Sequence, residues 1–479
     1  MRSTAQRNAE TATDQFNGSV HRSWRGTEKG ETTQSRRMAI GWAAFLGGSL
    51  ALLGCGGEGA DGAAVEVSAT DDPLTFATAG ATKLFVPPPN PGAVKQIASL
   101  IKAHDFKNAA RLTALEATPR AVWFTDGGPR DVEKAVRKTM AAAACEHRVP
   151  VLVAYNLPYR DCAQYSAGGA TDTAAYKAWI DGFAKGIGKD KAIVILEPDG
   201  LGLIPYNTDI FGAAEWCKPT VTAADGTQVP APGANPDERY AQLQYAGGVL
   251  GTKAPNATVY FDSTNSAWLG VGEAAYRLHR ATHDPATGAA LGRGFFLNAS
   301  NYRTTDEAIQ YGTWVSMCTA FATNPDEGGW RLGNFGWCAS QYNPASGHGV
   351  DYTPAYAASV TAQIQGLMGA AVAKLPFVVD TGRNGQGAWA PAASYPDAQV
   401  WCNAPGRGVG PRPTTTTGKA LADAYLWIKV PGESDGSCNR GVAGSTIDPE
   451  WGGIVDPVAG AWFPQQALQL AQLANPPLL

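Results

Sequence analysis

Four aspartates follow apolar runs of this 479-residue chain, and their side chains could serve as general acids or bases. Asp161 follows the run PVLVAY, Asp199 follows AIVILE, Asp262 ends ATVYFD, and Asp435 follows AYLWIK. A carboxyl group acts as an acid when burial or a negative neighbour keeps it protonated, and as a base when it stays ionised. The four residues therefore predict acid–base chemistry, if the fold brings them together.

Each of these residues also has a purely structural interpretation. Asp199 could be a helix N-cap, which is the commonest use of an aspartate after a strand. Asp161 could be ion-paired with Arg160, the tryptophans could be core or interface aromatics, and DTGRNGQG at 380–387 could be a turn. What favours chemistry over these alternatives is that such residues recur, one group after each apolar run.

Seven short apolar runs, separated by longer helix-like segments, are the elements that would position these side chains. Most runs are β-branched and continuous rather than alternating, which is typical of parallel strands buried on both faces. No dinucleotide-binding glycine motif follows the first run, so we predict an α/β barrel rather than a doubly wound sheet. The runs are AVWF (121–124), PVLVAY (150–155), AIVILE (192–197), ATVYFD (257–262), FFLN (295–298), PFVVD (376–380) and AYLWIK (424–429).

Acids, amides and aromatic residues follow all seven runs, where a β/α barrel has its active site. Aromatic faces stack on sugar rings, and carboxylates or amides bind sugar hydroxyls. Two carboxyl groups on either side of a bond are what glycoside hydrolysis requires. The pattern therefore predicts a site for a neutral polysaccharide.

The composition agrees with an uncharged ligand. Lys plus Arg is 38 and Asp plus Glu is 42, which leaves a net charge of -4. The chain therefore has no excess of positive charge that would attract the phosphates of nucleic acid. Charged residues are 17% of the chain, below the roughly 25% of ordinary globular proteins, while 14 tryptophans exceed what a core needs. The six histidines show no metal-ligand spacing, so we expect no metal and no cofactor.

The N-terminal region predicts export. An apolar stretch at 38–54 follows Arg36 and Arg37 and suits a signal sequence. Leu52-Leu53-Gly54-Cys55 is similar to a bacterial lipobox, which would make Cys55 the lipidated residue and the only membrane contact; an ordinary secretory signal is the alternative. We predict an export region at 1–55, a flexible tether at 56–84, a catalytic domain at 85–479, and an extracellular or outer-surface location.

Because disulfides persist in oxidising environments outside the cytosol, export predicts that the cysteines form disulfides. With Cys55 set aside, seven remain, and three pairs with one thiol is the simplest count. Cys145 ends the apolar run AAAAC, so we predict that it is the buried thiol.

Several segments together resemble glycoside hydrolase family 6, from about Phe85 to the C-terminus. The resemblance implies a distorted, partly open β/α barrel of about seven parallel strands, with long disulfide-tied loops over a cleft or tunnel at its C-terminal face. It also implies a monomeric cellulase acting on β-1,4-glucan, either cellulose or cello-oligosaccharides. The segments are VAYNLPYRDCAQYSAGG (153–169), VILEPDGLG (194–202), VYFDSTNSAW (259–268), NASNY (298–302), VVDTGRNGQG (378–387), WCNAPGRGVGPRP (401–413) and WIKVPGESDG (427–436).

The resemblance assigns catalytic roles by position. Asp199 corresponds to the general acid, and Asp161 to the neighbouring carboxylate that raises its pKa. Tyr155 corresponds to the tyrosine that distorts the central sugar ring. Family members invert the anomeric configuration, so Asp435 is the candidate base, with a water chain to Asp161 as the alternative.

The resemblance also assigns binding residues and disulfides. The implied pairs are Cys162 with Cys217 and Cys402 with Cys438, which leaves Cys318 with Cys338. Arg383 would hold Asp435 in place. The substrate-binding residues are then Trp123, Asp262, Trp268, Asn298, Arg383, Trp401, Lys429 and Glu433.

Some positions depart from the family pattern. Ala167 stands where the family often has a serine that positions the attacking water, although Ser166 is adjacent. No second tryptophan follows Trp268 at the distal product side, the segment from 301 to 380 is long, and we expect no separate cellulose-binding module. The loops at 401–413 and 435–463 favour a cellobiohydrolase that releases cellobiose from non-reducing ends, with an endoglucanase as the alternative.

Two other classes of protein share features with this sequence. Gly432-Glu-Ser-Asp-Gly436 matches the nucleophile elbow of serine hydrolases, but that fold needs a histidine after the serine, and the last histidine is His348. A catalytically inactive glucan-binding surface protein is the more distant alternative, because Ala167 in place of the serine could reflect a loss of catalytic activity.

Overall fold

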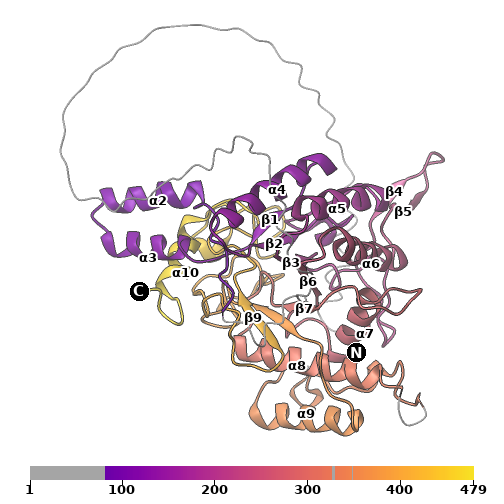
Figure 1. Cartoon of the computed structure of the whole chain (residues 1–479). Coiled ribbons are helices and arrows are strands. Elements are labelled where there is room, and N and C mark those ends of the chain that lie inside the picture. The colour runs from indigo at the N-terminus through magenta and orange to yellow at the C-terminus, as the bar shows by residue number, and fades with distance from the viewer. Residues whose placement is uncertain (1–80, 326–328, 348) are drawn as a thin grey trace. The chain divides into compact units, whose positions relative to one another are not determined.

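Seven parallel strands form one curled sheet in the computed structural model, which describes residues 81–325, 329–347 and 349–479 (Figure 1). Each strand falls within or overlaps one of the predicted apolar runs, and the sheet order is β1-β2-β3-β6-β7-β8-β9. The predicted fold class is therefore confirmed. The strands are β1 (Val122–Phe124), β2 (Val151–Ala154), β3 (Ala192–Leu196), β6 (Ala257–Asp262), β7 (Gly294–Leu297), β8 (Phe377–Asp380) and β9 (Ala422–Leu426).

The first and last strands approach each other without forming a full ladder. The Ala121 amide donates to the Trp427 carbonyl (2.9 Å), and the Trp123 indole donates to the Ile428 carbonyl (2.8 Å). Curling of the sheet thus brings β1 alongside the segment that directly follows β9, so parts of the chain distant in sequence meet.

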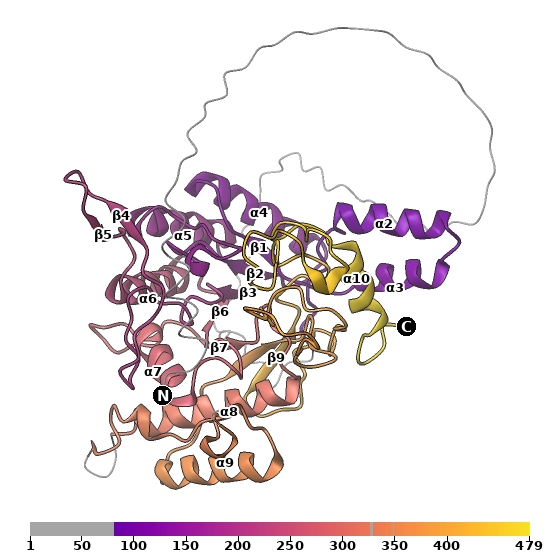
Figure 2. The same ribbon diagram turned by 180° about the vertical axis from the view of Figure 1, so that it is seen from behind.

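Helices connect the strands and cover the outer face of the sheet (Figures 1 and 2). Several begin at side-chain caps, such as Asp172 for α5, Asn235 for α6 and a Thr304–Glu307 capping box for α8. The helices are α2 (Pro91–Lys102), α3 (Phe106–Glu116), α4 (Pro129–Cys145), α5 (Thr173–Ile187), α6 (Pro236–Lys253), α7 (Val271–Thr282), α8 (Thr305–Ala322), α9 (Pro354–Met368) and α10 (Pro464–Gln472).

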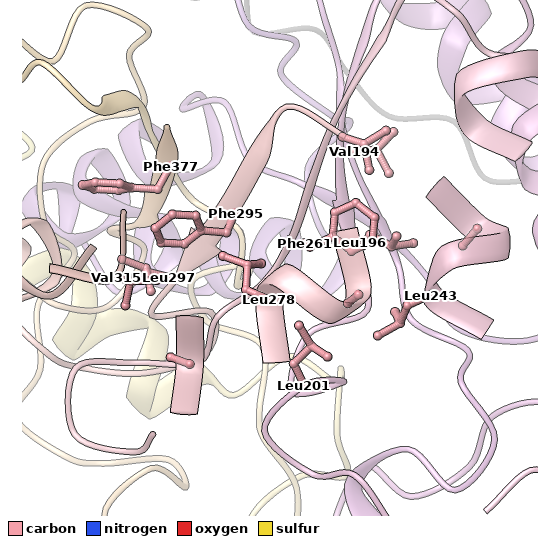
Figure 3. Packing of buried hydrophobic residues seen from close by; sticks show 14 of the residues in the cluster. Val194, Leu196, Leu201, Leu243, Phe261, Leu278, Phe295, Leu297, Val315 and Phe377 are labelled. Carbon is pink, nitrogen blue, oxygen red and sulfur yellow. The ribbon is translucent and has the colours of Figure 1, made fainter. Parts of the chain in front are cut away.

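Alternate side chains of each strand enter two separate cores. Val194, Leu196, Phe261 and Phe295 point outward and pack against helix residues that include Leu243, Leu278 and Val315 (Figure 3). Ile193, Ile195, Tyr260, Phe296 and Val378 point inward and fill the inside of the curled sheet. Burial on both faces explains why the runs are continuously apolar.

Three disulfides tie the loops, and their pairing is the predicted one: Cys162–Cys217, Cys318–Cys338 and Cys402–Cys438. The prediction of a buried thiol was wrong, because Cys145 is exposed. It is the last residue of α4, whose buried positions are Val132, Val136, Met140 and Ala143. Cys145 is two residues, about 200° of helical rotation, beyond Ala143 and so faces solvent.

The predicted export region, Cys55 and most of the tether lie outside the described residues. Within the described part of the chain, no helix combines the length and the apolar character needed to cross a membrane. A small antiparallel pair, β4 (Thr220–Thr222) and β5 (Gln228–Pro230), forms an exposed ribbon between β3 and α6.

Candidate active site

A cavity of about 840 Å³ lies at the carboxyl ends of the strands. Ten of the residues predicted from the sequence line it together, while Asn298 and Arg383 lie behind its wall. The ten are Trp123, Tyr155, Asp161, Asp199, Asp262, Trp268, Trp401, Lys429, Glu433 and Asp435.

Asp199 faces the cavity and is surrounded by other carboxyl groups. Burial raises its pKa well above the ordinary value, and the negative charges of Asp262, Asp161 and Asp435 raise it further. Asp199 is not a helix cap, since the next α-helix is α6, which Asn235 caps. Its backbone has φ +62°, a left-handed conformation that is costly for a residue other than glycine. Asp199 is therefore a carboxyl group whose protonated form is favoured by its surroundings, held in a strained position at the cavity wall.

Buried groups beneath the cavity fix the loop that carries Asp199. The Glu197 carboxylate accepts hydrogen bonds from the amides of Asn156 and Leu157. Arg239 on α6, 1% exposed, donates to the carbonyls of Pro158 and Gly200. Sequence reasoning missed Arg239, although it is a charged residue in register with the apolar face of its helix. These contacts join the ends of β2 and β3.

Asp161 lies next to Ser166 rather than forming an ion pair with Arg160. Its Oδ2 accepts hydrogen bonds from the Ser166 amide (2.8 Å) and the Ser166 hydroxyl (3.0 Å). Arg160 instead donates to the backbone carbonyls of Thr125, Tyr155 and Ser166. Burial raises the pKa of Asp161, although the two Ser166 hydrogen bonds oppose the shift. Ser166, adjacent to Ala167, thus presents a hydroxyl that is hydrogen-bonded to Asp161 at the cavity wall.

Tyr155 lies between two side chains that fix its ring. The ring meets Trp123 edge-on, with centroids 5.4 Å apart, and the Arg160 guanidinium lies 4.7 Å from its centroid. Burial, together with the charges of Asp199 and Asp161, raises the pKa of Tyr155, so its hydroxyl stays protonated. Tyr155 therefore presents a rigid neutral phenol to the cavity.

Asp435 is the carboxylate that remains ionised. Its Oδ2 accepts from Arg383 (2.6 Å) and from the Asn403 amide (2.8 Å), and its Oδ1 lies 3.1 Å from Lys429 Nζ. Burial disfavours the charge, but Arg383 and Lys429 outweigh burial and lower the pKa of Asp435 below its ordinary value. Arg383 is fully buried and binds Asp435, so the structure places it as a positioning residue rather than at the cavity surface.

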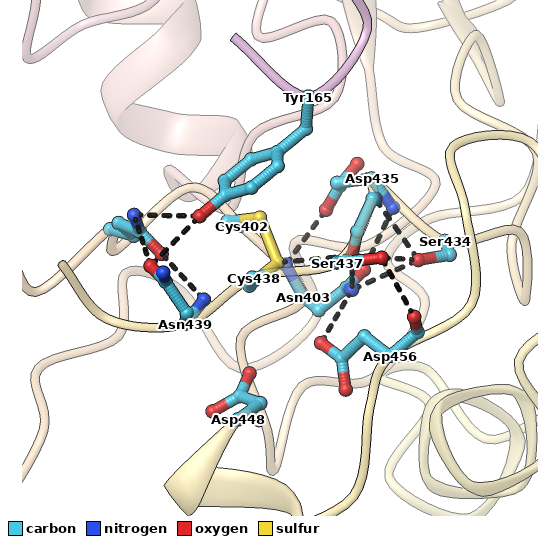
Figure 4. Close-up of a disulfide and its surroundings, with 12 residues drawn as sticks. Tyr165, Cys402, Asn403, Ser434, Asp435, Ser437, Cys438, Asn439, Asp448 and Asp456 are labelled. Atoms are coloured by element: carbon cyan, nitrogen blue, oxygen red, sulfur yellow. Dashed lines mark hydrogen bonds between the residues drawn. A yellow bond between two sulfur atoms is a disulfide. The ribbon is translucent and has the colours of Figure 1, made fainter. Parts of the chain in front are cut away.

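A buried polar network extends behind Asp435 (Figure 4). The Asn403 side chain accepts from the Asp435 amide and donates to Asp456 Oδ2 (2.8 Å). Asp448 is ion-paired with Arg440 (2.5 Å), with neither side chain exposed. Sequence reasoning missed this network, because its members come from loops far apart in the chain.

This network also contains a cluster of possible metal ligands. Ligand atoms of Cys438, Asp448 and Asp456 lie within 4.8 Å of one another. The Cys438 sulfur is bonded to Cys402, and Asp448 is paired with Arg440. These existing partners argue against a metal at this position.

Asp262 and Asp380 bind backbone amides at the strand ends. Asp262 accepts from the amides of Leu201 and Thr264, and burial raises its pKa. Asp380 accepts from the amides of Ser300, Gly382, Ile428 and Lys429, and burial raises its pKa to about 6. Asp262 in this way joins the loops after β3 and β6, and Asp380 joins the loops after β7, β8 and β9.

Asn298 is fully buried, with φ +68°. Its amide group donates to the carbonyls of Arg303 and Asp380, and its oxygen accepts from the Arg303 amide. These bonds leave its side chain inside the loop rather than at the cavity, so the structure places Asn298 as a positioning residue.

Glu433 and Lys429 lie on the same side of the cavity as Asp435. Burial raises the pKa of Glu433, although Lys429 and a hydrogen bond from the Asn90 amide group oppose the shift. Lys429 Nζ also donates to the Ser434 carbonyl (3.0 Å). Both side chains retain polar atoms that can bind sugar hydroxyls.

Aromatic side chains line the rest of the cavity. Trp123, Trp268 and Trp401 are half-buried, so each shows part of its indole to the cavity. Trp216 and Trp389 also line it, and sequence reasoning missed both because neither directly follows a strand. The cavity therefore offers five indoles and several carboxyl groups.

Tyr165 joins the loop after β2 to two loops from the C-terminal part of the chain (Figure 4). Its hydroxyl donates to Asn439 Oδ1 and accepts from Gln399 Nε2, both at 3.0 Å. Its ring centroid lies 5.9 Å from that of Trp401. A Cβ on Gly436 would lie 2.4 Å from the Tyr165 Cβ, so only glycine permits this approach.

The family model for glycosyl hydrolases family 6 matches residues 79–474. Endoglucanase A of Thermobispora bispora is 31% identical over 393 residues, which are 82% of this chain and 63% of that protein. Endoglucanase 1 of Streptomyces halstedii is 35% identical over 343 residues, 71% of this chain and 78% of that protein.

A solved structure is similar over the same region. It is the endoglucanase Cel6 from Mycobacterium tuberculosis in complex with methyl-cellobiosyl-4-deoxy-4-thio-β-D-cellobioside. The identity is 31% and the TM-score 0.53, and the match covers 82% of this chain and 98% of that one. The chain spans less than two thirds of the length of the Thermobispora relative.

Proposed function

The chain belongs to glycosyl hydrolase family 6, and we propose that it hydrolyses the β-1,4-glucosidic bonds of cellulose and cello-oligosaccharides with inversion of configuration. The observation that carries this proposal is the contrast between two carboxyl groups on one cavity. Asp199 has a raised pKa and Asp435 a lowered one. Two carboxyl groups whose environments separate their pKa values in this way are suited to acid and base roles.

Asp199 is the proposed general acid. Its raised pKa favours the protonated form, and it donates this proton to the glycosidic oxygen as the bond to the leaving sugar breaks. Positive charge then develops on the sugar ring, and the carboxylates of Asp161 and Asp435 stabilise that charge. Tyr155, held by Trp123 and Arg160, limits the conformations that the sugar bound beside it can adopt.

Asp435 is the proposed base for the attacking water. Its Oδ2 accepts hydrogen bonds from Arg383 and the Asn403 amide, and its Oδ1 lies beside Lys429. Asp435 is therefore a weak base whose position is well defined. The second candidate is Asp161, reached through a water chain. The raised pKa of Asp161 and the Ser166 hydroxyl beside it favour this route.

We propose exo action, with release of cellobiose from the non-reducing end. The support is Tyr165, which links the loop after β2 to the loops at 397–402 and 436–445 and so helps to enclose the cavity. The endoglucanase alternative is favoured by the names of the two curated relatives and of the solved structure.

The proposed location is outside the cell, with Cys55 as a lipid anchor. The support is the sequence pattern alone: an apolar stretch at 38–54 followed by Leu-Leu-Gly-Cys. Expression of a Cys55→Ser variant tests it. Release of active protein into the medium supports the anchor, while an unchanged distribution between cells and medium contradicts it.

Incubation with cellohexaose and with carboxymethylcellulose tests the activity and its mode. We expect cellobiose as the main product and a slow fall in viscosity. A fast viscosity fall with few soluble sugars would contradict exo action. No hydrolysis of either substrate by the wild type would contradict the enzymatic function and favour the non-catalytic glucan-binding alternative.

A further inference from the structure

A second group of exposed aromatic side chains lies outside the cavity, on two loops that meet beside it. Phe211, in the loop between β3 and β4, is 67% exposed. Trp330 and Trp337, in the loop between α8 and α9, are 42% and 53% exposed. A Cβ on Gly336 would lie 3.6 Å from the Phe211 ring, so the two loops are in contact. We call the surface formed by Phe211, Trp330 and Trp337 the aromatic platform.

The two indoles of the platform lie close together and at a small angle. Their ring centroids are 5.8 Å apart and their planes differ by 33°. The Arg331 guanidinium lies 4.4 Å from the Trp330 ring, but the Arg331 residue itself is only 4% exposed. The exposed part of the platform is therefore apolar and uncharged.

The part of the loop around Trp337 is held in place by the rest of the fold. The Cys318–Cys338 disulfide closes it, and Phe335, 3% exposed, packs on α7 next to Tyr276. Gln363 on α9 donates to the Trp337 carbonyl (2.8 Å). A surface fixed in this way loses little conformational entropy on binding.

Hydrogen bonds connect the segment that follows Trp337 to the wall of the cavity. The Tyr342 hydroxyl donates to the carbonyl of Trp268 (2.7 Å), and the Gln341 amide group donates to that of Leu269 (2.8 Å). Trp268 lines the cavity, and so does Trp216, which shares a loop with Phe211. The platform therefore lies beside the part of the cavity formed by Trp268 and Trp216.

We propose that the aromatic platform is an accessory binding site for β-1,4-glucan chains at the surface of insoluble cellulose. This inference rests on the proposed function, because the platform adjoins the cavity where the same polymer is cut. Indoles offer flat apolar faces to the C–H faces of glucose rings, and a glucan carries no charge that would need a partner.

Binding of the full chain to microcrystalline cellulose at low temperature tests the platform. We expect a Trp330→Ala/Trp337→Ala variant to bind at least about tenfold more weakly, and a Trp337→Phe variant to keep most of the affinity. Phe106→Ala is the matched control, because Phe106 is 60% exposed on α3 and outside the platform. It should bind like the wild type.

Hydrolysis of cellohexaose separates the platform from the catalytic proposal. We expect the double variant to keep wild-type kcat/KM on this soluble substrate and to lose activity on cellulose. Unchanged cellulose binding in the double variant would overturn the proposal that the platform binds glucan. A dimer that the double substitution converts to a monomer, with cellulose affinity unchanged, would also overturn it. If the wild type does not hydrolyse cellohexaose, only the catalytic proposal is contradicted, since the cellulose-binding assay does not depend on turnover.

Discussion

Replacement of Arg383 by methionine should destabilise the fold because it leaves a buried carboxylate short of a partner. Arg383 Nη1 lies 2.6 Å from Asp435 Oδ2, and the two side chains are 0% and 6% exposed. Loss of one partner from a buried ion pair costs about 3–5 kcal/mol. Lys429 Nζ, 3.1 Å from Oδ1, remains as a second partner. We therefore expect the lower end, a loss of about 3 kcal/mol in the free energy of unfolding.

A second substitution shows whether the loss comes from the unpaired charge. In the Arg383→Met/Asp435→Asn variant no carboxylate remains to be compensated, so the double variant should be less destabilised than the sum of the single variants. We expect a coupling free energy of about 1–3 kcal/mol. The control is Arg137→Met, which breaks the exposed Arg137–Glu133 pair and should cost at most about 1 kcal/mol.

Urea unfolding with the disulfides oxidised measures these free energies. The assay belongs at neutral pH, because the pKa of Asp435 is lowered in the folded protein. A group of this kind stabilises the fold above its unfolded pKa, about 3.9 for aspartate, and loses that contribution as the pH falls through its folded pKa. Additive effects within about 0.5 kcal/mol at neutral pH would refute the conclusion that Asp435 is ionised and held by Arg383.

Three further predictions concern the cavity. Asp262→Asn removes a negative neighbour that raises the pKa of Asp199, so the alkaline limb of kcat against pH should move to lower pH; an unmoved limb would contradict the coupling. Ser166→Ala removes one of two hydrogen bonds to Asp161, and kcat on cellohexaose should fall by about tenfold; wild-type kcat would show that the hydroxyl has no role. Tyr165→Ala breaks the link to Asn439 and Gln399, so the ratio of soluble to insoluble reducing ends from cellulose should fall, and an unchanged ratio would contradict the enclosing role of Tyr165.

The strands and most residues of the cavity wall could be predicted because the relevant information is local. A strand such as AIVIL is buried on both faces, and this leaves a continuous apolar run in the sequence. The residues that follow such runs meet in space because parallel strands end at one edge. Asp161, Asp199 and Asp435 therefore reach one cavity, as predicted.

Contacts between loops could not be predicted because nothing local encodes them. Tyr165 and Asn439 are 274 residues apart, and Asn403 binds Asp435 and Asp456 from a separate loop. Burial was also misjudged at single positions. Cys145 lies on the exposed face of α4, although the run AAAAC is apolar, because alanine is tolerated on both faces of a helix.

The most direct test of the central claim compares Asp199→Ala with the wild type on two substrates. Cellohexaose has a sugar leaving group that needs protonation, whereas a cellobioside with a strongly acidic phenol as leaving group does not. If Asp199 is the general acid, kcat on cellohexaose should fall by about 10²–10⁴-fold while the activated cellobioside is largely spared. Equal losses on both substrates, or full activity on cellohexaose, would contradict the assignment.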